Sequence, residues 1–356
     1  MIKVAINGFG RIGRLAFRAW HAKYKDKIDI VAINTSGSMP ASSWAHLIKY
    51  DTIYKEFPGK ISSKDEKKPG EATDEDPRIG TIIVGDKEIP ILAQREPSKL
   101  PWSKYQVEVV IESTGVFRTP EQATAHIKAG AKRVVISAPT KEEDGSEVGT
   151  YVLGVNKYEG KEKIISNASC TTNCVAPVAA ILHSKFGIKK ATMTSVHGYT
   201  ANQNLQDNSH KDLRRARAAA QNIIPTTTGA AEATIKAIPE LSGLFDGIAI
   251  RVPVAVGSIA DLVCLLKQRV TVDQVNQAFK EAENKAHWKG IVATIEEPIV
   301  SSDIVGRSES AIIDLAFTQV VDGDLVKVLA WYDNELGYSF RLVEQVIQVG
   351  KTINSG

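Results

Sequence analysis

The sequence predicts an α/β protein of two domains, the first built on a parallel sheet and the second an α+β domain with a mixed or antiparallel sheet. The chain of 356 residues is longer than one typical domain and suits two, each large enough to bury its own core. Strand-like and helix-like segments alternate over its first part, which is typical of a parallel sheet covered by helices. After about residue 169, long β-branched runs replace this alternation.

The first strand-helix-strand unit occupies the first 34 residues. We expect a buried strand over Ile2 to Asn7, a helix over Ile12 to about Tyr24 and a second strand over Ile28 to Asn34. The alternation continues with a strand at 107–111, a helix at 120–129 and a strand at 134–136. Ser62 to Arg78 departs from it, because this segment is mostly charged and carries two prolines and a glycine. It predicts a solvated loop.

The second half begins with a predicted helix from Cys170 to about Phe186. We expect strands at Ala191–Val196, Ile248–Val252 and Val326–Tyr332. A further helix is predicted over Val272 to Ala286, behind the capping residue Thr271. A last helix follows from the helical spacing of Leu336, Phe340, Val343 and Ile347.

Composition argues against several classes of function. The 44 basic and 41 acidic residues leave a formal charge of only +3, which gives no support to a nucleic-acid or membrane-surface role. The three cysteines cannot form a complete disulfide framework. No signal segment precedes the first predicted strand, and no apolar stretch reaches the length of a membrane span. We therefore expect a cytoplasmic protein.

A glycine-rich turn joins the first predicted strand to the first predicted helix. The pattern G-x-G-x-x-G is filled by Gly8, Phe9, Gly10, Arg11, Ile12 and Gly13. Glycines allow a tight turn and a close approach of the backbone, while the helix N-terminus offers free N–H groups to a pyrophosphate. A merely structural turn is the alternative, but the strand before and the helix after favour a Rossmann dinucleotide-binding domain.

The end of the second predicted strand lacks an acidic residue. A unit that binds NAD normally ends this strand with Asp or Glu, which accepts hydrogen bonds from the adenosine ribose. This chain has Asn34, Thr35, Ser36 and Ser38 there. A carboxylate would repel a 2'-phosphate, whereas hydroxyl and turn N–H groups can donate to it. On this stretch alone, a 2'-phosphate site and an idle polar turn both remain open.

The start of the helix after residue 169 carries the best candidate nucleophile. Cys170 lies among hydroxyl residues at a probable helix N-terminus, where the free N–H groups should stabilise a thiolate and lower its pKa. Cys174 and Cys264 have apolar neighbours and are interpreted as packing residues. His197 follows a predicted strand and is the candidate base. The cysteine spacing lacks a second ligand pair, so no metal is expected.

Taken together, these motifs resemble phosphorylating glyceraldehyde-3-phosphate dehydrogenase, in the order found in that family. The matching segments are Asn7–Arg14, Ala168–Asn173, the segment of His197, Pro225–Ala231, Arg251–Pro253 and Trp331–Glu335. The resemblance runs nearly end to end, with the charged segment 62–78 as its main insertion. It implies a homotetramer. It also implies a Rossmann domain of residues 1–169, completed by a C-terminal helix at 335–356, and a catalytic domain of residues 170–334.

The resemblance also implies roles for individual residues. Cys170 would be the nucleophile and His197 its base, so that glyceraldehyde 3-phosphate, inorganic phosphate and NAD(P)+ give 1,3-bisphosphoglycerate through a Cys170 thioester. Thr200 and Arg251 would hold the substrate phosphate. The attacking phosphate would be held by Ser169, Thr171, Thr228 and Gly229. The cofactor would meet Thr114, Gly115, Ser137 and, at the nicotinamide amide, Asn334.

Two departures from the family pattern concern the cofactor. Members specific for NAD carry Asp directly after the Asn that ends the second strand, where this chain has Thr35. They also tend to carry a Leu-Pro-like pair where this chain has Asn208 and Ser209. In members that accept NADP, such a serine reaches the 2'-phosphate from the neighbouring subunit, and an arginine matching Arg95 is nearby. The sequence therefore predicts that NADP is preferred or that both cofactors are used.

Two other functions remain as alternatives. A paralogue that oxidises erythrose 4-phosphate keeps much the same residues, and a non-catalytic binding protein could retain the fold. The intact pair of Cys170 and His197 argues against the second alternative. The basic run Lys211 to Arg217 is interpreted as part of a subunit interface or active-site rim. Asn202, where many members have Asp, leaves one detail of the phosphate site open.

Overall fold

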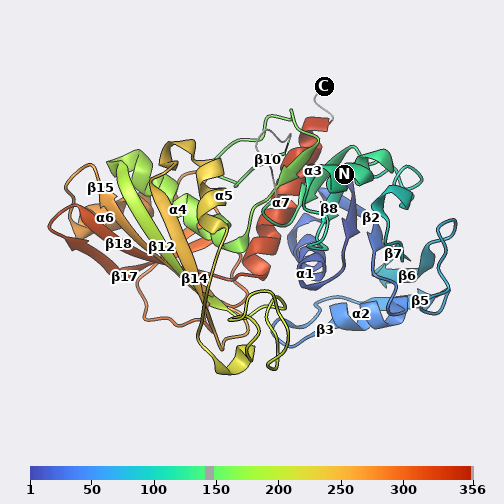
Figure 1. Ribbon diagram of the computed structural model, residues 1–356. Coiled ribbons are helices and arrows are strands. Elements are labelled where there is room, and N and C mark those ends of the chain that lie inside the picture. The colour runs from blue at the N-terminus through green and yellow to red at the C-terminus, as the bar shows by residue number, and fades with distance from the viewer. Residues whose placement is uncertain (141–147, 354–356) are drawn as a thin grey trace. The chain divides into compact units, whose positions relative to one another are not determined.

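The computed structural model describes residues 1–140 and 148–353 and divides the chain into two compact units (Figure 1). The first unit comprises Met1–Thr150, Tyr158–Asn167 and Leu342–Gly356, and the second comprises Tyr151–Lys157 and Ala168–Arg341. The division differs from the expected one in two details. The short segment Tyr151–Lys157 belongs to the second unit, and the C-terminal helix passes from the second unit to the first at Leu342.

A nine-stranded sheet forms the centre of the first unit, in the order β10-β11-β9-β8-β1-β2-β7-β6-β5. Its strands are β1 (Ile2–Asn7), β2 (Ile28–Asn34), β5 (Ile61–Asp65), β6 (Arg78–Val84), β7 (Lys87–Leu92), β8 (Val109–Glu112), β9 (Arg133–Ile136), β10 (Gly149–Thr150) and β11 (Ile164–Ser166). Pairing is parallel from β10 to β7 and antiparallel among β7, β6 and β5. The expected parallel sheet is therefore confirmed, with an antiparallel extension at one edge.

The remaining elements of this unit are short. They are the helices α1 (Arg11–Ala19), α2 (Ala41–Lys49) and α3 (Pro120–Lys128), a 3-10 turn at Pro97–Lys99 and a small sheet of β3 (Tyr50–Asp51) and β4 (Lys55–Glu56). The helix expected up to Tyr24 is α-helical only to Ala19, and Trp20–Tyr24 continues it as a π-helix. α3 begins at a capping box, in which Thr119 and Gln122 bond each other's backbone N–H groups.

The prediction of a loop over Ser62 to Arg78 was wrong at both ends. Residues 62–65 belong to β5, and Arg78 begins β6, with which β5 pairs. The charged residues indicated a loop, but β5 is the last strand of the sheet, and its side chains are half-buried or exposed. An edge strand needs backbone partners on one side only and commonly carries charged side chains. The loop proper is residues 66–77.

The second unit is built on a seven-stranded mixed sheet in the order β13-β14-β12-β15-β18-β17-β16. Its strands are β12 (Ile188–Gly198), β13 (Ile224–Thr226), β14 (Phe245–Val252), β15 (Ser258–Leu266), β16 (Val292–Ile295), β17 (Ala311–Val321) and β18 (Leu325–Tyr332). Its helices are α4 (Cys170–Phe186), α5 (Ala230–Ala237), α6 (Val272–Glu283) and the first part of α7 (Leu336–Ile353), with 3-10 turns at Ala219–Gln221 and Pro239–Leu241. The expected strands and helices are all present, and Thr271 caps α6 as predicted.

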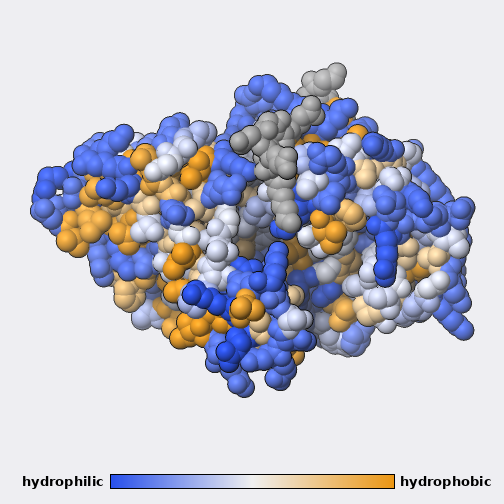
Figure 2. All heavy atoms as spheres, viewed as in Figure 1, coloured by the Kyte–Doolittle hydropathy of each residue, from blue (hydrophilic) through white to orange (hydrophobic). Residues whose placement is uncertain are grey.

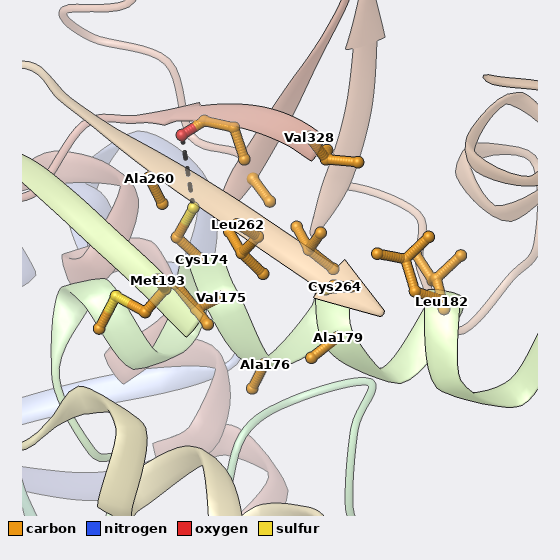
Figure 3. Packing of buried hydrophobic residues seen from close by; sticks show 14 of the residues in the cluster. Cys174, Val175, Ala176, Ala179, Leu182, Met193, Ala260, Leu262, Cys264 and Val328 are labelled. Carbon is orange, nitrogen blue, oxygen red and sulfur yellow. Dashed lines mark hydrogen bonds between the residues drawn. The ribbon is translucent and has the colours of Figure 1, made fainter. Parts of the chain in front are cut away.

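The core of this unit lies between α4 and the sheet, and Figure 3 shows part of it. Residues of β15 alternate between buried and half-buried, so one face of the strand meets the helix. Cys174 and Cys264 are fully buried there, which confirms their interpretation as packing residues. The Cys174 thiol points to the carbonyl oxygen of Ala330 at 3.8 Å, the dashed line in Figure 3.

The described residues contain neither a helix that could cross a membrane nor a cluster that could hold a metal ion. Within residues 1–140 and 148–353, no helix has both the length and the apolar character needed to cross a membrane. In the same ranges, no group of three or more His, Cys, Asp or Glu side chains is arranged to hold a metal ion.

Candidate active site

The glycine turn between β1 and α1 is held tightly against the segment after β8. Gly8 has a φ of +94°, and a Cβ there would lie 2.5 Å from the backbone nitrogen of Thr114. A Cβ on Gly13 would lie 2.2 Å from the carbonyl oxygen of Gly8. A Cβ on Gly10 would meet nothing within 4 Å, although Gly10 is the N-cap of α1. Two glycines are therefore required by the fold, and the third keeps the helix N-terminus open.

A cavity of about 500 Å³ lies beside this turn. It is lined by Asn7, Gly8, Phe9, Gly10, Asn34, Thr35, Ser36, Trp44, Gln94, Arg95, Ser113, Thr114, Val116 and Phe117. An elongated ligand with a pyrophosphate fits this combination of backbone N–H groups, glycine surface and polar strand ends. The turn and its open helix N-terminus thus match the demands of a dinucleotide.

Five predicted cofactor residues of the first unit do not line this cavity: Arg11, Ile12, Gly13, Gly115 and Ser137. The Arg11 guanidinium forms an ion pair with Asp51, and Ile12 is half-buried in α1. Gly115 has a φ of +73°, and Ser137 follows β9 with its N–H donating to the carbonyl oxygen of Glu112. Arg11 and Ile12 shape the turn, and their backbone is the part available to a ligand.

A buried carboxylate below the turn was missed in the sequence interpretation. Glu112, at the end of β8, is 2% exposed and accepts hydrogen bonds from four groups. These donors are Asn7 Nδ2, His126 Nε2 and both the N–H and the hydroxyl of Thr114. Trp102 donates its indole N–H to His126 Nδ1, so the proton of His126 is on Nε2. This network fixes the strand ends that carry the turn.

The end of β2 contains no acidic side chain, and its residues are in part already hydrogen-bonded. Asn34 accepts from the N–H of Gln94 and donates to Asn7 and to the Gln94 carbonyl. The hydroxyl of Thr35 donates to the Leu92 carbonyl at 3.0 Å. This differs from the expectation that the hydroxyl donates to a phosphate, because its proton is in use.

The hydroxyl pair of Ser36 and Ser38 and the guanidinium of Arg95 remain able to donate to an anion beside Thr35. Ser36 and Ser38 are paired hydroxyl to hydroxyl at 2.9 Å on the surface. The exposed guanidinium of Arg95 lines the cavity and has no hydrogen-bond or ion-pair partner among the residues that the structure describes. The donor set at this end therefore consists of surface hydroxyls and one cation.

The second unit brings the predicted nucleophile and base together. Cys170 is the first residue of α4, and the hydroxyl of Ser169 caps the helix by accepting from the N–H of Thr172. His197 lies near the end of β12, and its Nε2 is 3.4 Å from Cys170 Sγ. Cys170 as a residue is half-buried, and His197 is 3% exposed. This distance permits direct proton transfer between the two side chains.

His197 Nδ1 has two neighbours that compete for it. The Gly198 carbonyl oxygen lies at 2.6 Å and would accept a proton from Nδ1, whereas Arg251 Nη1 lies at 2.8 Å and can only donate. Arg251 Nη1 also has the Gly198 carbonyl as acceptor at 3.2 Å. If the Nδ1 proton is donated to the Gly198 carbonyl at the shorter distance, Arg251 Nη1 has the same carbonyl as its acceptor, and Nε2 is the basic nitrogen that faces Cys170.

The pKa values of the pair differ from the sequence expectation. Burial raises the pKa of the Cys170 thiol, while the Arg251 guanidinium and hydrogen bonds from Thr171 act in the opposite direction. Burial and then Arg251 lower the pKa of His197 to about 3. The expected lowering of the thiol pKa at the helix N-terminus is therefore wrong for the free protein, because burial outweighs it. Burial thus favours the neutral form of both the thiol and the imidazole.

Arg251 lies at the centre of the polar residues around this pair. It comes from β14, next to β12 in the sheet, and His197 pairs with it in register. Its Nε is a buried donor without a hydrogen-bond partner among the described residues. Arg215 lies close enough to lower the pKa of Arg251 further, after burial as the main cause. A buried cation with an unused donor beside a second cation favours an anionic ligand.

The remaining predicted phosphate residues, Thr200, Thr228 and Gly229, lie in loops at the same end of the sheet. The Thr228 hydroxyl accepts from the N–H of Ala230, and Gly229 is the N-cap of α5. Thr200 follows β12 and accepts from the N–H of Asn202. Arg215, which the sequence interpretation left in a basic run, donates to the Thr226 hydroxyl and the Thr227 carbonyl. Its donation orders the segment that leads to Thr228.

A tyrosine hydroxyl behind the cysteine was also missed. Tyr332 ends β18 and is 1% exposed. Its hydroxyl lies 2.9 Å from that of Thr171 and 2.8 Å from that of Ser195. Its ring meets His197 edge-on at 6.0 Å between centroids. The sequence held two signals for it: Tyr332 ends a predicted strand and lies in the matching segment Trp331–Glu335.

Two predicted cofactor residues lie in the second unit. Asn334 uses its Oδ1 to accept from the Gly257 N–H and the Ser258 hydroxyl, so its amide is oriented with Nδ2 as the free donor. Ser209 is exposed, and its N–H donates to the side chain of Asn208. The surrounding loops, 199–223, carry the exposed apolar side chains Leu205, Leu213 and Ile223. Figure 2 shows apolar and hydrophilic residues intermixed over this part of the surface.

Comparison with known proteins agrees with the motifs in both units. Residues 2–120 match the family described as glyceraldehyde 3-phosphate dehydrogenase, NAD binding domain, and residues 169–334 match its C-terminal domain. The glyceraldehyde-3-phosphate dehydrogenase of Streptomyces coelicolor is 50% identical over 355 residues, 99% of each chain. That of Mycobacterium tuberculosis H37Rv is 48% identical over 356 residues, 99% of each chain. Glyceraldehyde-3-phosphate dehydrogenase 1 of Bacillus cereus is 47% identical over 347 residues, 97% of each chain.

Similarity at this level over nearly the whole length establishes the family, and the geometry of the second unit retains what its chemistry needs. Cys170 and His197 are in contact, and Arg251 lies against them with a free donor. The chain therefore belongs to the glyceraldehyde-3-phosphate dehydrogenase family of NAD(P)-dependent phosphorylating oxidoreductases.

Proposed function

We propose that the chain oxidises glyceraldehyde 3-phosphate, with inorganic phosphate, to 1,3-bisphosphoglycerate through a thioester on Cys170. The observation that carries this proposal is the 3.4 Å contact between Cys170 Sγ and His197 Nε2 at the N-terminus of α4. A neutral thiol beside a neutral imidazole can attack an aldehyde with proton transfer in the same step. The free N–H groups of the helix N-terminus can stabilise the oxyanion that develops.

Residues of the second unit can carry out each proton transfer in this series of reaction steps. As Cys170 Sγ forms its bond to the carbonyl carbon, the thiol proton passes to the substrate oxygen by way of His197, giving a hemithioacetal. When bound, NAD(P)+ supplies the hydride acceptor for the next oxidation. His197 Nε2 takes the hydroxyl proton in that oxidation, which leaves a thioester on Cys170. Attack by phosphate breaks the C–S bond, releases the acyl phosphate and lets His197 return its proton to the thiolate.

Two anions must be held near Cys170, and the polar groups suffice for both. The unpaired donor of Arg251 and the Thr200 hydroxyl suit the substrate phosphate. The Ser169, Thr171 and Thr228 hydroxyls and the N–H groups at Gly229 suit the attacking phosphate. Arg215 adds positive charge close to Arg251.

We propose further that the enzyme uses NADP+ in preference to NAD+ or accepts both. Three features support this proposal: no carboxylate follows Asn34, the surface hydroxyls lie next to it, and Arg95 lines the cavity with no partner among the described residues. Ser209 would contribute from a neighbouring subunit, as in relatives that accept NADP. We therefore also propose a homotetramer, which the exposed apolar side chains of loops 199–223 favour.

A burst experiment tests the thioester. Mixing the enzyme with glyceraldehyde 3-phosphate and NAD(P)+ in the absence of phosphate should release one equivalent of reduced cofactor per subunit and then stop. Cys170→Ser should show no burst, whereas Cys264→Ala, which alters a buried core cysteine, should retain it. A full burst from Cys170→Ser would refute the mechanism.

Steady-state rates test the substrate and the cofactor. We expect a higher kcat/KM for glyceraldehyde 3-phosphate than for erythrose 4-phosphate, and the reverse would establish the paralogous activity. We expect NADP+ to be at least as efficient as NAD+. Arg95→Ala should raise the KM for NADP+ about tenfold, the equivalent of one ionic hydrogen bond, while changing that for NAD+ less than twofold. A strong preference of the wild type for NAD+ would refute the cofactor assignment.

A further inference from the structure

The charged loop, residues 66–77, forms one wall of a second cavity beside the end of β2. This cavity of about 330 Å³ is lined by Ser36, Gly37, Gly70, Ala72, Thr73, Asp74, Ala93, Gln94 and Arg95. It shares Ser36, Gln94 and Arg95 with the larger cavity at the glycine turn. The two cavities therefore adjoin at the end of β2, where the expected acidic residue is missing. Asp74 is the one carboxylate in either lining.

Asp74 is held in this position by a buried side chain. Gln94 is 7% exposed, and its Nε2 donates to Asp74 Oδ1 at 2.9 Å. Gln94 is itself anchored to Asn34, which accepts from its N–H and donates to its carbonyl. Lys99 binds the second oxygen, Oδ2, of Asp74. The carboxylate is thus connected through Gln94 to Asn34, the residue directly before the position at which the family pattern of NAD-specific members places an Asp.

We propose that Asp74 determines cofactor specificity, by supplying from the charged loop the carboxylate that the end of β2 lacks. This inference rests on the proposed use of a nicotinamide dinucleotide and deepens it. Arg95, which lines both cavities, favours a 2'-phosphate, and Asp74, which lines only the second, opposes it from there. Because the two charges face the same space, the enzyme accepts both cofactors, and the presence of Asp74 limits its preference for the phosphorylated one.

Adenosine fragments test this proposal independently of activity. We would measure the binding of 2',5'-ADP and 5'-AMP to the full chain by calorimetry, for the wild type and for Asp74→Asn. The asparagine keeps an oxygen for Gln94, so the loop stays in place while one negative charge is lost. We expect Asp74→Asn to bind 2',5'-ADP about three- to tenfold more tightly and 5'-AMP within twofold of the wild type. The gain should shrink in 0.5 M salt, where charges are screened beyond about 4 Å.

Asp76→Asn is the matched control. Asp76 lies in the same loop and forms an ion pair with Lys67, but it lines neither cavity. It should leave the affinity for both fragments unchanged. Equal effects of the two substitutions, or no effect of Asp74→Asn, would overturn the role of Asp74. The burst at Cys170 is unaffected by either result, so a failure of this inference is distinguishable from a failure of the proposed function. Binding of neither fragment to any variant would instead refute the dinucleotide site.

Discussion

The two sites of this chain are made from different parts of the polypeptide. In the first unit, the candidate cofactor site depends on backbone, because glycines clear the space and strand ends present N–H groups. In the second unit, the candidate catalytic site depends on side chains, with His197 in contact with both Cys170 and Arg251. The two are also buried differently. Polar atoms below the turn are satisfied by one another, whereas a donor of Arg251 is left unused.

Because of this difference, the two sites should tolerate different substitutions. A backbone site is damaged by an added atom at Gly8 or Gly13, whatever its chemistry, because the fold has no room for a Cβ at either position. A side-chain site tolerates changes of volume better than changes of charge or of hydrogen-bonding capacity. The largest loss of stability and of dinucleotide binding is therefore expected at the backbone site.

Gly8→Ala should cause the largest loss. The new Cβ would lie 2.5 Å from the backbone nitrogen of Thr114, at a φ of +94° that L-residues avoid. We expect the free energy of unfolding to fall by roughly 3 to 4 kcal/mol and dinucleotide binding to be lost. Denaturant unfolding and calorimetry would measure the two effects.

Gly10→Ala is the control, because its Cβ would meet nothing within 4 Å. We expect stability close to that of the wild type but weaker dinucleotide binding, since the methyl group projects into the open cavity. Wild-type binding by both alanine variants would contradict the backbone origin of the site.

Arg251→Gln should cause the next largest loss, in activity rather than stability. Loss of one or two ionic hydrogen bonds, about 3 kcal/mol, should lower kcat/KM for the aldehyde on the order of a hundredfold. Arg251 also lowers the pKa of Cys170, so its removal should raise that pKa further. The rate of iodoacetamide alkylation at neutral pH should then fall, and its rise with pH should move to more alkaline values.

Arg269→Gln controls for loss of a positive charge in the same unit, because Arg269 forms an exposed pair with Asp322. It should change neither kcat/KM nor the alkylation profile. An alkylation profile of Arg251→Gln that coincides with the wild type would exclude an effect of Arg251 on the thiol.

Glu112→Gln should have a smaller effect, on the stability of the first unit. The carboxylate accepts from Asn7, His126 and Thr114, and an amide would turn one acceptor into a donor facing other donors. We expect a loss of about 2 kcal/mol in the free energy of unfolding, measured in denaturant. Glu108→Gln, at a largely buried position just before β8 where the carboxylate pairs with the exposed Lys132, should lose less than half of this. Equal losses would show that the network adds nothing.

The sequence was sufficient for the parts of each site that obey local rules. The glycine turn, the start of α4 at Cys170 and the alternation of strands and helices in the first unit follow from spacing and periodicity, and the structure confirms them. The contact between Cys170 and His197 rested on resemblance, since nothing local brings residues 27 apart within 3.4 Å. Sheet pairing achieves it, because β12 lies beside the strands against which α4 packs.

Other features could not be predicted because they depend on distant partners. The hydrogen bond that occupies the Thr35 hydroxyl comes from Leu92, in a neighbouring strand. The raised pKa of Cys170 follows from burial, which no helix position reveals. The sequence does not distinguish Asp74 from the other charged residues of its segment. The hydrogen bond from Gln94 is what connects it to the end of β2. In each case a local rule was overridden by tertiary structure.

Tyr332→Phe should have the smallest effect, and it tests whether the side-chain site depends on a shared hydroxyl cluster. Its hydroxyl lies within 3 Å of those of Thr171 and Ser195. Removing it should cost about 1 kcal/mol of stability and lower kcat a few-fold. Burial raises the pKa of Tyr332, so the phenol is neutral and the effect should be constant through neutral pH. Combining it with Ser195→Ala gives a double-mutant cycle, in which a shared hydrogen bond predicts a coupling of about 1 kcal/mol and strict additivity excludes it.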